Sequence, residues 1–159
     1  MKEEYEYSAK VRDIEPFIKY CKENNYKLID KTTQKRVLFK NNNKILARVT
    51  TIKKDKSKNV FLDFKDENET EDILKISRET GKIDVTDNMD FVDSVLSMLE
   101  FDFHKELDRV RYVYKKNKVT FEIDEYLNPK MKVVGIEGNK EVVDEIYKAL
   151  EKEFKKWKC

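Results

Sequence analysis

The sequence predicts a single α+β domain, in which an antiparallel barrel or curved sheet of hairpin-linked strands is flanked by three helices. Many segments alternate between polar and apolar residues and are separated by short polar turns, as in antiparallel sheets. Three other segments carry apolar residues at helical spacing. A chain of 159 residues with three glycines and two prolines fits one domain, residues 1–159, and leaves little material for a linker.

The first half of the chain is predicted to contain one helix and five strands. Asp13 is a candidate N-cap and Pro16 lies in the first turn of the helix, which ends at Asn24. A loop rich in Asp, Glu and Asn is expected at 66–72. The expected strands are 4–11, 32–39, 44–51, 60–65 and 73–79.

The second half is predicted to contain two helices and three strands. The first helix follows Asp87 and is expected to bury an apolar face of Phe91, Val92, Val95, Leu96 and Leu99. The second begins after Gly138 and is expected to bury Val142, Val143, Ile146, Ala149, Leu150 and Phe154. The expected strands are 110–114, 119–123 and 131–136.

Composition excludes several classes of protein. The chain has 34 basic and 32 acidic residues, a net charge of +2, which argues against a dedicated nucleic-acid-binding protein. The polar N-terminus and the lack of a long apolar run predict neither a signal peptide nor a membrane span. Cys21 and Cys159 are expected to be free thiols, so we expect a cytoplasmic protein. His104 is the only histidine, which gives little support for a zinc site, and we expect it to be a surface or packing residue.

Charged residues recur at a period of two inside the predicted strands. Glu4 and Glu6 share one strand face, and Arg109 and Arg111 share another, because side chains two residues apart point the same way. These faces either meet solvent, as charged residues generally do, or line the polar interior of a closed sheet. Composition and spacing leave both alternatives open.

The order of the charged segments resembles that of the CYTH, or triphosphate-tunnel, family, which includes class IV adenylyl cyclases and thiamine triphosphatases. The opening segment is similar to the family pattern E-x-E-x-K, and the last is similar to E-I-E-G. The resemblance covers nearly the whole chain, in the right order. The matching segments are E-Y-E-Y-S at 4–8, I-L-A-R at 45–48, L-D-F-K at 62–65, D-R-V-R-Y at 108–112, F-E-I-D-E at 121–125 and G-I-E-G at 135–138.

This resemblance implies a closed eight-stranded antiparallel barrel whose tunnel has one basic and one acidic wall. The basic wall would bind a triphosphate such as ATP, thiamine triphosphate or tripolyphosphate, and the acidic wall would bind Mg²⁺ or Mn²⁺. The implied triphosphate-binding residues are Arg48, Lys65, Arg78, Arg109 and Arg111. The implied metal ligands are Glu4, Glu6, Asp124 and Glu137, and Glu4 and Glu6 are also the implied catalytic residues. From the residues alone, Lys65 also fits a solvated lysine at a loop edge, and Asp124 a turn residue.

Three positions depart from the family patterns. Ser8 replaces a lysine, Leu46 an arginine and Gly135 a glutamate, while Lys10 and Lys44 lie near enough in sequence to replace the lost cations. We therefore keep three hypotheses. The chain is a metal-dependent triphosphatase or cyclase, a polyphosphate- or nucleotide-binding module with impaired catalysis, or a β-protein whose outward charges bind a protein partner. Whether an exposed barrel rim or helix pairs two copies as a homodimer is not determined by the sequence.

Overall fold

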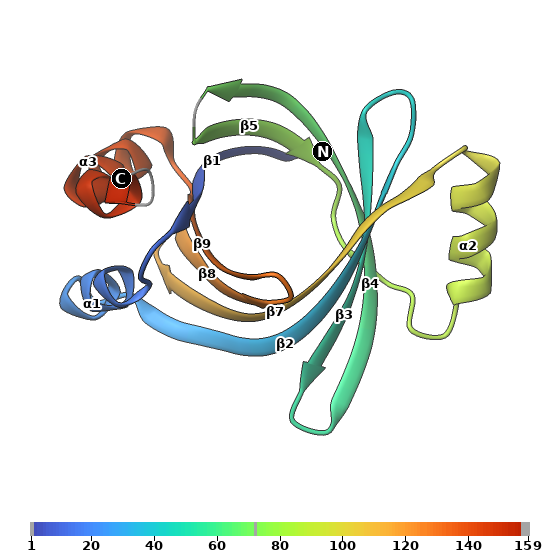
Figure 1. Ribbon diagram of the computed structural model, residues 1–159, viewed down its shortest axis with the longest axis horizontal. Coiled ribbons are helices and arrows are strands. Elements are labelled where there is room, and N and C mark those ends of the chain that lie inside the picture. Colours follow the sequence, from blue (N-terminus) through green and yellow to red (C-terminus); the bar gives the residue numbers. More distant parts are fainter. Residues whose placement is uncertain (1, 72, 157–159) are drawn as a thin grey trace.

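The computed structural model describes residues 2–71 and 73–156, which form nine strands and three helices (Figure 1). The helices are α1 (Glu15–Glu23), α2 (Met89–Met98) and α3 (Lys140–Lys155). The strands are β1 (Lys2–Val11), β2 (Lys27–Lys40), β3 (Ile45–Lys54), β4 (Ser57–Glu71), β5 (Leu74–Glu79), β6 (Ile83–Asp84), β7 (Asp102–Lys116), β8 (Val119–Leu127) and β9 (Lys130–Glu137).

Eight of the strands form a closed ring. Their order is β3-β2-β7-β8-β9-β1-β5-β4, and the pairing of β3 with β4 closes the ring. The pairings around the ring are all antiparallel. The two-residue strand β6 pairs with β4 beside the ring. The predicted closed eight-stranded antiparallel barrel with flanking helices is confirmed.

Several strands are longer than predicted. β4 continues through residues 66–71. The prediction of a loop at 66–72 is therefore wrong for residues 66–71. β7 begins at Asp102, although its strand was expected only from residue 110. Charged residues have weak strand propensity, but a strand inside a closed barrel has a backbone partner on each side. Backbone pairing therefore outweighs the side-chain preference in these segments.

The larger hydrophobic core lies between the outside of the barrel and the helices α1 and α3, which lie together on one side (Figure 1). Phe17 of α1 and Phe154 of α3 meet edge to face at 4.9 Å between ring centroids. The predicted face of α3 is buried at Val143, Ile146, Leu150 and Phe154, whereas Val142 and Ala149 are exposed. Asp13 lies one residue before the N-cap of α1, Ile14, and accepts a hydrogen bond from the Glu15 amide at 3.0 Å.

A second core lies under α2, on the opposite side of the barrel (Figure 1). Val92 and Leu96 of α2 are buried there against barrel residues such as Ala47 and Val49. The predicted apolar face of α2 is wrong at Phe91 and Leu99, which are 70% and 55% exposed. A helix of ten residues has only two or three turns, and here only a narrow stripe reaches the barrel.

The outside of the barrel therefore carries the hydrophobic packing, and its interior is left for polar side chains. Cys21 is a buried free thiol in the core under α1, and Cys159 lies outside the described residues. None of the helices formed by residues 2–71 and 73–156 is long and apolar enough to cross a membrane.

Candidate functional site

Strand β1 shows how the barrel separates inward and outward side chains. Glu4 and Glu6 line the central cavity. Tyr5 and Tyr7, on the opposite face, donate hydrogen bonds from their hydroxyls to Asp144 Oδ1 of α3, at 2.6 and 2.8 Å. Of the two alternatives left open by the sequence, the structure shows that these glutamates face the interior.

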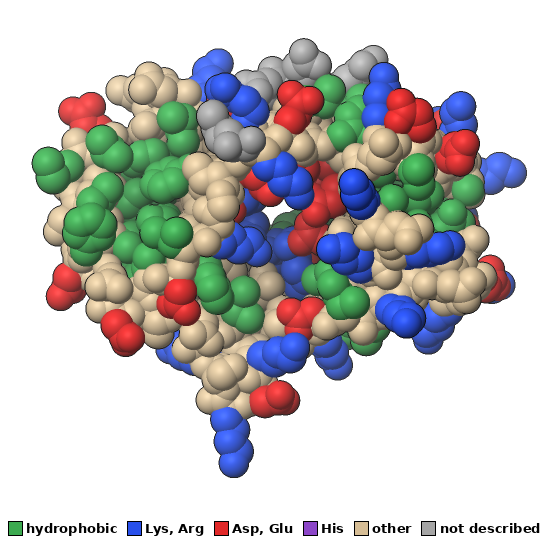
Figure 2. Space-filling model, turned by 180° about the vertical axis from the view of Figure 1, so that it is seen from behind, with side chains coloured by type: hydrophobic (Ala, Val, Ile, Leu, Met, Phe, Trp, Pro, Cys, Tyr) green, Lys and Arg blue, Asp and Glu red, His purple; other side chains and the backbone are tan. Residues whose placement is uncertain are grey.

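The central cavity, which we call the inner chamber, has a volume of about 230 Å³. Acidic side chains gather on one side of the opening and basic ones on the other (Figure 2). The acidic residues that line the chamber are Glu4, Glu6, Glu79, Glu122, Asp124 and Glu137. The basic ones include Arg36, Arg48, Lys65, Arg109 and Arg111.

Four of the five predicted triphosphate-binding residues line the inner chamber: Arg48, Lys65, Arg109 and Arg111. Arg109 is only 2% exposed, and its Nε and Nη2 donate to Gln34 Oε1 at 3.0 and 2.8 Å. Arg48 Nη2 lies 3.2 Å from Glu79 Oε2 and also pairs with Asp63. The hydrogen bonds to Gln34 and the carboxylates hold these guanidinium groups in place.

Arg78 does not belong to this set. It lies between Ser77 and Glu79 on β5, of which Glu79 lines the inner chamber, so the alternation of the strand turns Arg78 to the outer face. Its side chain is 47% exposed and pairs with Asp66. The expectation that Arg78 binds the triphosphate in the tunnel is therefore wrong.

Lys65 lies between the two walls of the inner chamber. Its Nζ is 3.6 Å from Glu4 Oε1 and 3.9 Å from Glu6 Oε2. The side chain is 10% exposed, so the alternative of a solvated lysine at a loop edge is excluded.

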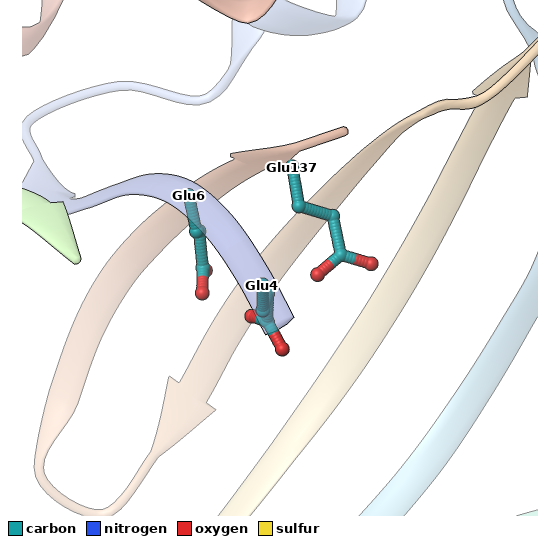
Figure 3. A group of neighbouring side chains, drawn as sticks. All are labelled: Glu4, Glu6 and Glu137. Atoms are coloured by element: carbon teal, nitrogen blue, oxygen red, sulfur yellow. The ribbon is translucent and has the colours of Figure 1, made fainter. Parts of the chain in front are cut away.

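Three of the four predicted metal ligands form one cluster. Glu4 and Glu6 come from β1, and Glu137 comes from the end of β9 (Figure 3). One carboxylate oxygen of each lies within 4.8 Å of the others. Three carboxylates at this spacing match the hard oxygen ligands that Mg²⁺ and Mn²⁺ prefer.

The close packing of these carboxylates shifts their pKa values. Burial, together with the charges of Glu122 and Glu4, raises the pKa of Glu137 to about 8. Burial and the neighbouring Glu4 carboxylate raise the pKa of Glu6 well above its ordinary value. Burial also acts to raise the pKa of Glu4, but hydrogen bonds with Glu6 and Glu79 and the charge of Lys65 outweigh it and lower this pKa. Protons in this cluster are therefore shared by Glu6 and Glu137 in preference to Glu4.

Asp124 lies in the chamber but not in this cluster. Its carboxylate accepts hydrogen bonds from Arg111 at 2.8 and 2.9 Å and lies 3.4 Å from Arg109 Nη1. Burial acts to raise the pKa of Asp124, but the charges of Arg111 and Arg109 outweigh it and lower the pKa. The structure thus places Asp124 as a partner of the basic wall, at a β8 position and not in a turn.

Arg36 was missed by the sequence-based prediction. It lines the chamber, and its Nε donates to Thr50 Oγ1 at 3.1 Å. Burial and then the charges of Arg109, Arg111 and Arg48 lower its pKa well below the ordinary value. No ion pair joins it to a carboxylate within the described part of the chain, in contrast to its three arginine neighbours. Its place as an arginine inside the predicted strand 32–39 was the available signal.

Glu79, Glu122 and Tyr126 were also missed. Glu122 pairs with Arg111, and Tyr126 accepts a hydrogen bond from Arg109 Nη1 at 3.1 Å. Glu122 and Tyr126 lie two residues either side of Asp124 on β8. Period-two spacing from a predicted site residue would have found both.

The three departures from the family patterns take different places. A Cβ atom at Gly135 would lie 2.4 Å from Glu6 Oε1, so the absence of a side chain leaves room for the Glu6 carboxylate. Ser8 lines the inner chamber, and Leu46 and Lys44 line a second cavity next to it. Lys10 lines neither of these two cavities, so the structure does not support it as a replacement for the lost lysine.

Ser77 of β5 is 1% exposed, and among the described residues its hydroxyl has no hydrogen-bond partner. It is paired with Glu4 in the β1–β5 register, and paired residues in an antiparallel ladder point to the same face. The unpaired hydroxyl is therefore on the face that carries the carboxylate cluster.

Comparison with known proteins yields structural likeness alone. No family model matches the chain, and no curated protein is detectably similar to it in sequence. A conserved hypothetical protein from Pyrococcus furiosus has a TM-score of 0.75 and 24% identity, covering 93% of this chain and 90% of that one. The HpAC1 protein from Hippeastrum, described as an adenylyl cyclase candidate with a dominant triphosphatase activity, has a TM-score of 0.64 and 16% identity, covering 98% and 87%.

The capping-enzyme triphosphatase of Mimivirus is more distant, with a TM-score of 0.54 and 10% identity over 95% of this chain and 89% of that one. The chain has the triphosphate-tunnel fold. The structural likeness shows the fold alone, because the sequence identities are low. The ligand and the reaction have to be inferred from the residues that line the tunnel.

Proposed function

We propose that this chain is a CYTH-like protein that binds a triphosphate and divalent cations inside its tunnel and processes the triphosphate. The observation that carries this proposal is a cluster of three glutamates that shares one chamber with four arginines. Arginines from β2, β3 and β7 face a cluster of three glutamates on β1 and β9. A triphosphate suits the arginine side, and its charge would be repelled by the glutamates unless cations lay between them.

Arg36, Arg48, Arg109, Arg111 and Lys65 are the groups we assign to the triphosphate oxygens. Guanidinium groups bind phosphate through paired N–H donors, and burial strengthens these bonds by excluding water. Of these four arginines, Arg36 is the one with no ion pair to a carboxylate of the described residues, so we expect it to contribute strongly.

Glu4, Glu6 and Glu137 are the residues that would hold Mg²⁺ or Mn²⁺, and the Ser77 hydroxyl is available on the same face. When bound, such a cation neutralises phosphate charge and polarises a phosphoryl oxygen. The pKa of Glu137 is about 8 and the pKa of Glu6 is raised, so we expect cation binding to release protons.

Two reactions fit this site. In one, water attacks the terminal phosphorus and releases phosphate; in the other, a ribose 3′-hydroxyl attacks the α-phosphorus and releases pyrophosphate. The chain's own contribution is the same in both, because the arginines position the triphosphate and stabilise its developing charge. The similar structures include proteins described as triphosphatases and others described as adenylate cyclase candidates, so both reactions are carried into the test.

A binding module without turnover is the second candidate. Leu46 occupies a position at which the family pattern has an arginine, and Arg48 and Arg111 are already paired with carboxylates. A lost contact to the transferring phosphoryl group typically lowers the rate by about 10²–10³. Such a module would still be stabilised by tripolyphosphate.

The test is a panel of tripolyphosphate, thiamine triphosphate and ATP with Mg²⁺ or Mn²⁺, assayed for phosphate, pyrophosphate and cyclic AMP. We expect Arg109→Gln to lower turnover by roughly 10²–10³, because it removes a buried donor to the phosphate. Arg78→Gln is the matched control, since this arginine points outward, and it is expected to keep full activity. Equal losses in the two variants, or full activity in Glu6→Gln, would contradict the proposal. Melting-temperature shifts with tripolyphosphate separate binding without turnover from the absence of binding.

A further inference from the structure

Helix α2 carries an apolar stripe that the barrel does not cover. Phe91, Val95 and Met98 are spaced four and three residues apart, so they share one side of the helix. Phe91 and Met98 are 70% and 82% exposed, while Val92 and Leu96 hold the helix on the barrel. Hydrophobic side chains gather on the side of the molecule that carries α2, at the left of Figure 2, with acidic side chains around them. An exposed apolar patch with a polar rim is typical of an interaction surface.

A groove of about 550 Å³ lies on the other side of α2. Asp93 lines it and follows Phe91 by two residues, which places it across the helix from the stripe. The apolar residues of the groove are Phe39, Leu96 and Phe101, and its acidic residues are Asp93, Glu100 and Asp102. We call residues 89–103 together with Phe39 the α2 face.

The carboxylates of this groove are unpaired. Within residues 2–71 and 73–156, no ion pair joins Asp93, Glu100 or Asp102 to a cation. The described side chains that line the groove include no lysine or arginine. The groove therefore suits a cationic side chain, whose aliphatic stem would cover the apolar floor while its charged end meets the carboxylates.

The charge of the surrounding segment has the same sign. Residues 83–103 contain six acidic residues and no lysine or arginine, although the whole chain has 34 basic residues among 159. A surface of this charge attracts a basic partner and repels the phosphates of nucleic acids and anionic lipids. It also disfavours a two-fold dimer of this chain, in which the α2 face would meet itself and bring like charges together.

Aromatic rings favour arginine over lysine as the entering cation. Phe103 is 62% exposed, and its ring meets that of the groove residue Phe39 edge to face, with 6.4 Å between the centroids. A guanidinium group stacks on aromatic rings and pairs with carboxylates through two parallel hydrogen bonds.

We propose that the α2 face docks a basic amphipathic segment of a partner protein. An arginine of the partner enters the groove between Asp93 and Glu100, and apolar side chains of the same segment cover the stripe of Phe91, Val95 and Met98. The α2 face lies outside the barrel and shares no residue with the inner chamber. This proposal therefore goes beyond the proposed function, and either can fail without the other.

A synthetic helical peptide with leucines on one face and arginines along both edges of that face is the probe. Two matched peptides carry glutamate in place of arginine, or serine in place of leucine. Fluorescence anisotropy of the labelled peptides measures their binding to the full chain. We expect only the arginine–leucine peptide to bind, with amide chemical-shift changes in the isotope-labelled chain at 39–42 and 89–103.

Variants of exposed residues test both parts of the surface. Asp93→Asn/Glu100→Gln is expected to weaken peptide binding about tenfold at low salt, because two charge pairs are lost, and added salt should reduce the difference. Met98→Ser is expected to weaken binding through lost apolar contact. Glu141→Gln/Glu145→Gln, at exposed positions of α3, removes the same charge elsewhere and is the matched control, expected to leave the affinity unchanged.

The other outcomes overturn the proposal. Binding of the glutamate peptide as tight as that of the arginine peptide, or equal losses in the two double variants, would show that the groove does not select a cation. No binding of the arginine–leucine peptide, or shift changes confined to the tunnel residues, would remove the α2 face as its docking site. Self-association of the chain that Met98→Ser abolishes, measured by sedimentation, would assign the face to a second copy, and Met98-dependent binding to phosphatidylcholine vesicles would assign it to a membrane. The melting temperature of each variant shows whether it is folded.

Discussion

Gly135 shows how one residue shapes the carboxylate cluster. It lies beside Ser8 in the β1–β9 register, and the family pattern has a glutamate at this position. The Glu6 carboxylate fills the space that a side chain at 135 would take, since a Cβ there would lie 2.4 Å from Glu6 Oε1. The absence of a glutamate at position 135 is thus linked to the position of the Glu6 carboxylate.

We predict that Gly135→Ala lowers the affinity for Mn²⁺ about 10- to 100-fold, the range typical of changes that disturb the orientation of metal ligands. The added methyl group displaces the end of the flexible Glu6 side chain and leaves the backbone in place. Mn²⁺ titration followed by electron paramagnetic resonance measures the effect. Gly81→Ala is the control, because a Cβ at Gly81 has no atom within 4 Å. Unchanged Mn²⁺ affinity in Gly135→Ala would remove Glu6 from the ligand set.

At the scale of single residues, the matched segments contained most of the inward charges, although Glu122, inside the segment 121–125, was missed. The sequence-based prediction failed at Arg78, whose neighbours Ser77 and Glu79 both belong to the opposite face. It also missed Arg36, which belongs to no family motif. A residue next to a motif is as near in sequence as one within it, but the alternation of a strand sends the two to opposite sides.

At the scale of elements, helix α3 packs on the outer face of β1, the strand that carries Glu4 and Glu6. Asp144 of α3 accepts hydrogen bonds from both Tyr5 and Tyr7, and Tyr7 stacks on Tyr147 with 4.2 Å between ring centroids. These contacts fix the outer face of β1. The inner face, with Glu4 and Glu6, is thereby fixed as well.

We predict that Asp144→Asn lowers the free energy of unfolding by about 1.5–3 kcal/mol, the usual range for a hydrogen bond to a charged group. The asparagine side chain keeps the shape of the aspartate but lacks the negative charge that accepts the hydrogen bonds from both tyrosine hydroxyls. Urea denaturation measures the change, with Glu145→Gln on an exposed position of the same helix as the control. Equal stabilities of the two variants would show that this contact does not hold β1.

At the scale of the whole molecule, hydrophobic cores outside the barrel leave a charged interior. The helices cover two opposite sides of the ring, and the apolar residues beneath them form the two cores (Figure 1). Charges of both signs inside the barrel then largely neutralise one another through pairs such as Arg48–Asp63 and Arg111–Asp124. The low net charge of +2 is therefore compatible with a strongly charged cavity.

We predict that, without divalent cations, the free energy of unfolding falls as the pH rises from about 4.5 to about 8. Glu137 has an ordinary pKa of 4.5 and a pKa of about 8 in the folded chain, and the pKa of Glu6 is raised in the same direction. Between these values the folded state binds more protons than the unfolded state, so each such proton lowers stability by about 1.4 kcal/mol per pH unit. The lowered pKa of Glu4 makes stability rise with pH, but this effect is confined to pH values below 4.5, the ordinary pKa of Glu4.

Urea denaturation at several pH values between about 5 and 8.5, with and without Mg²⁺, measures this dependence. Mg²⁺ is expected to replace the protons, so its stabilising effect should grow with pH. Stability that rises with pH in this range without divalent cations would contradict the assigned proton sharing.

The sequence by itself determined that this chain has alternating strands, amphipathic helices and charges at a period of two, because these patterns depend on residues close together in the chain. The tertiary structure alone decided which face of each strand is enclosed. The pairing of β1 with β9 sets Glu6 opposite Glu137, from the other end of the chain, and β5, which pairs with both β1 and β4, brings Lys65 beside them. Enclosure is a property of the complete ring, since a face becomes the interior only when the last pair of strands has joined.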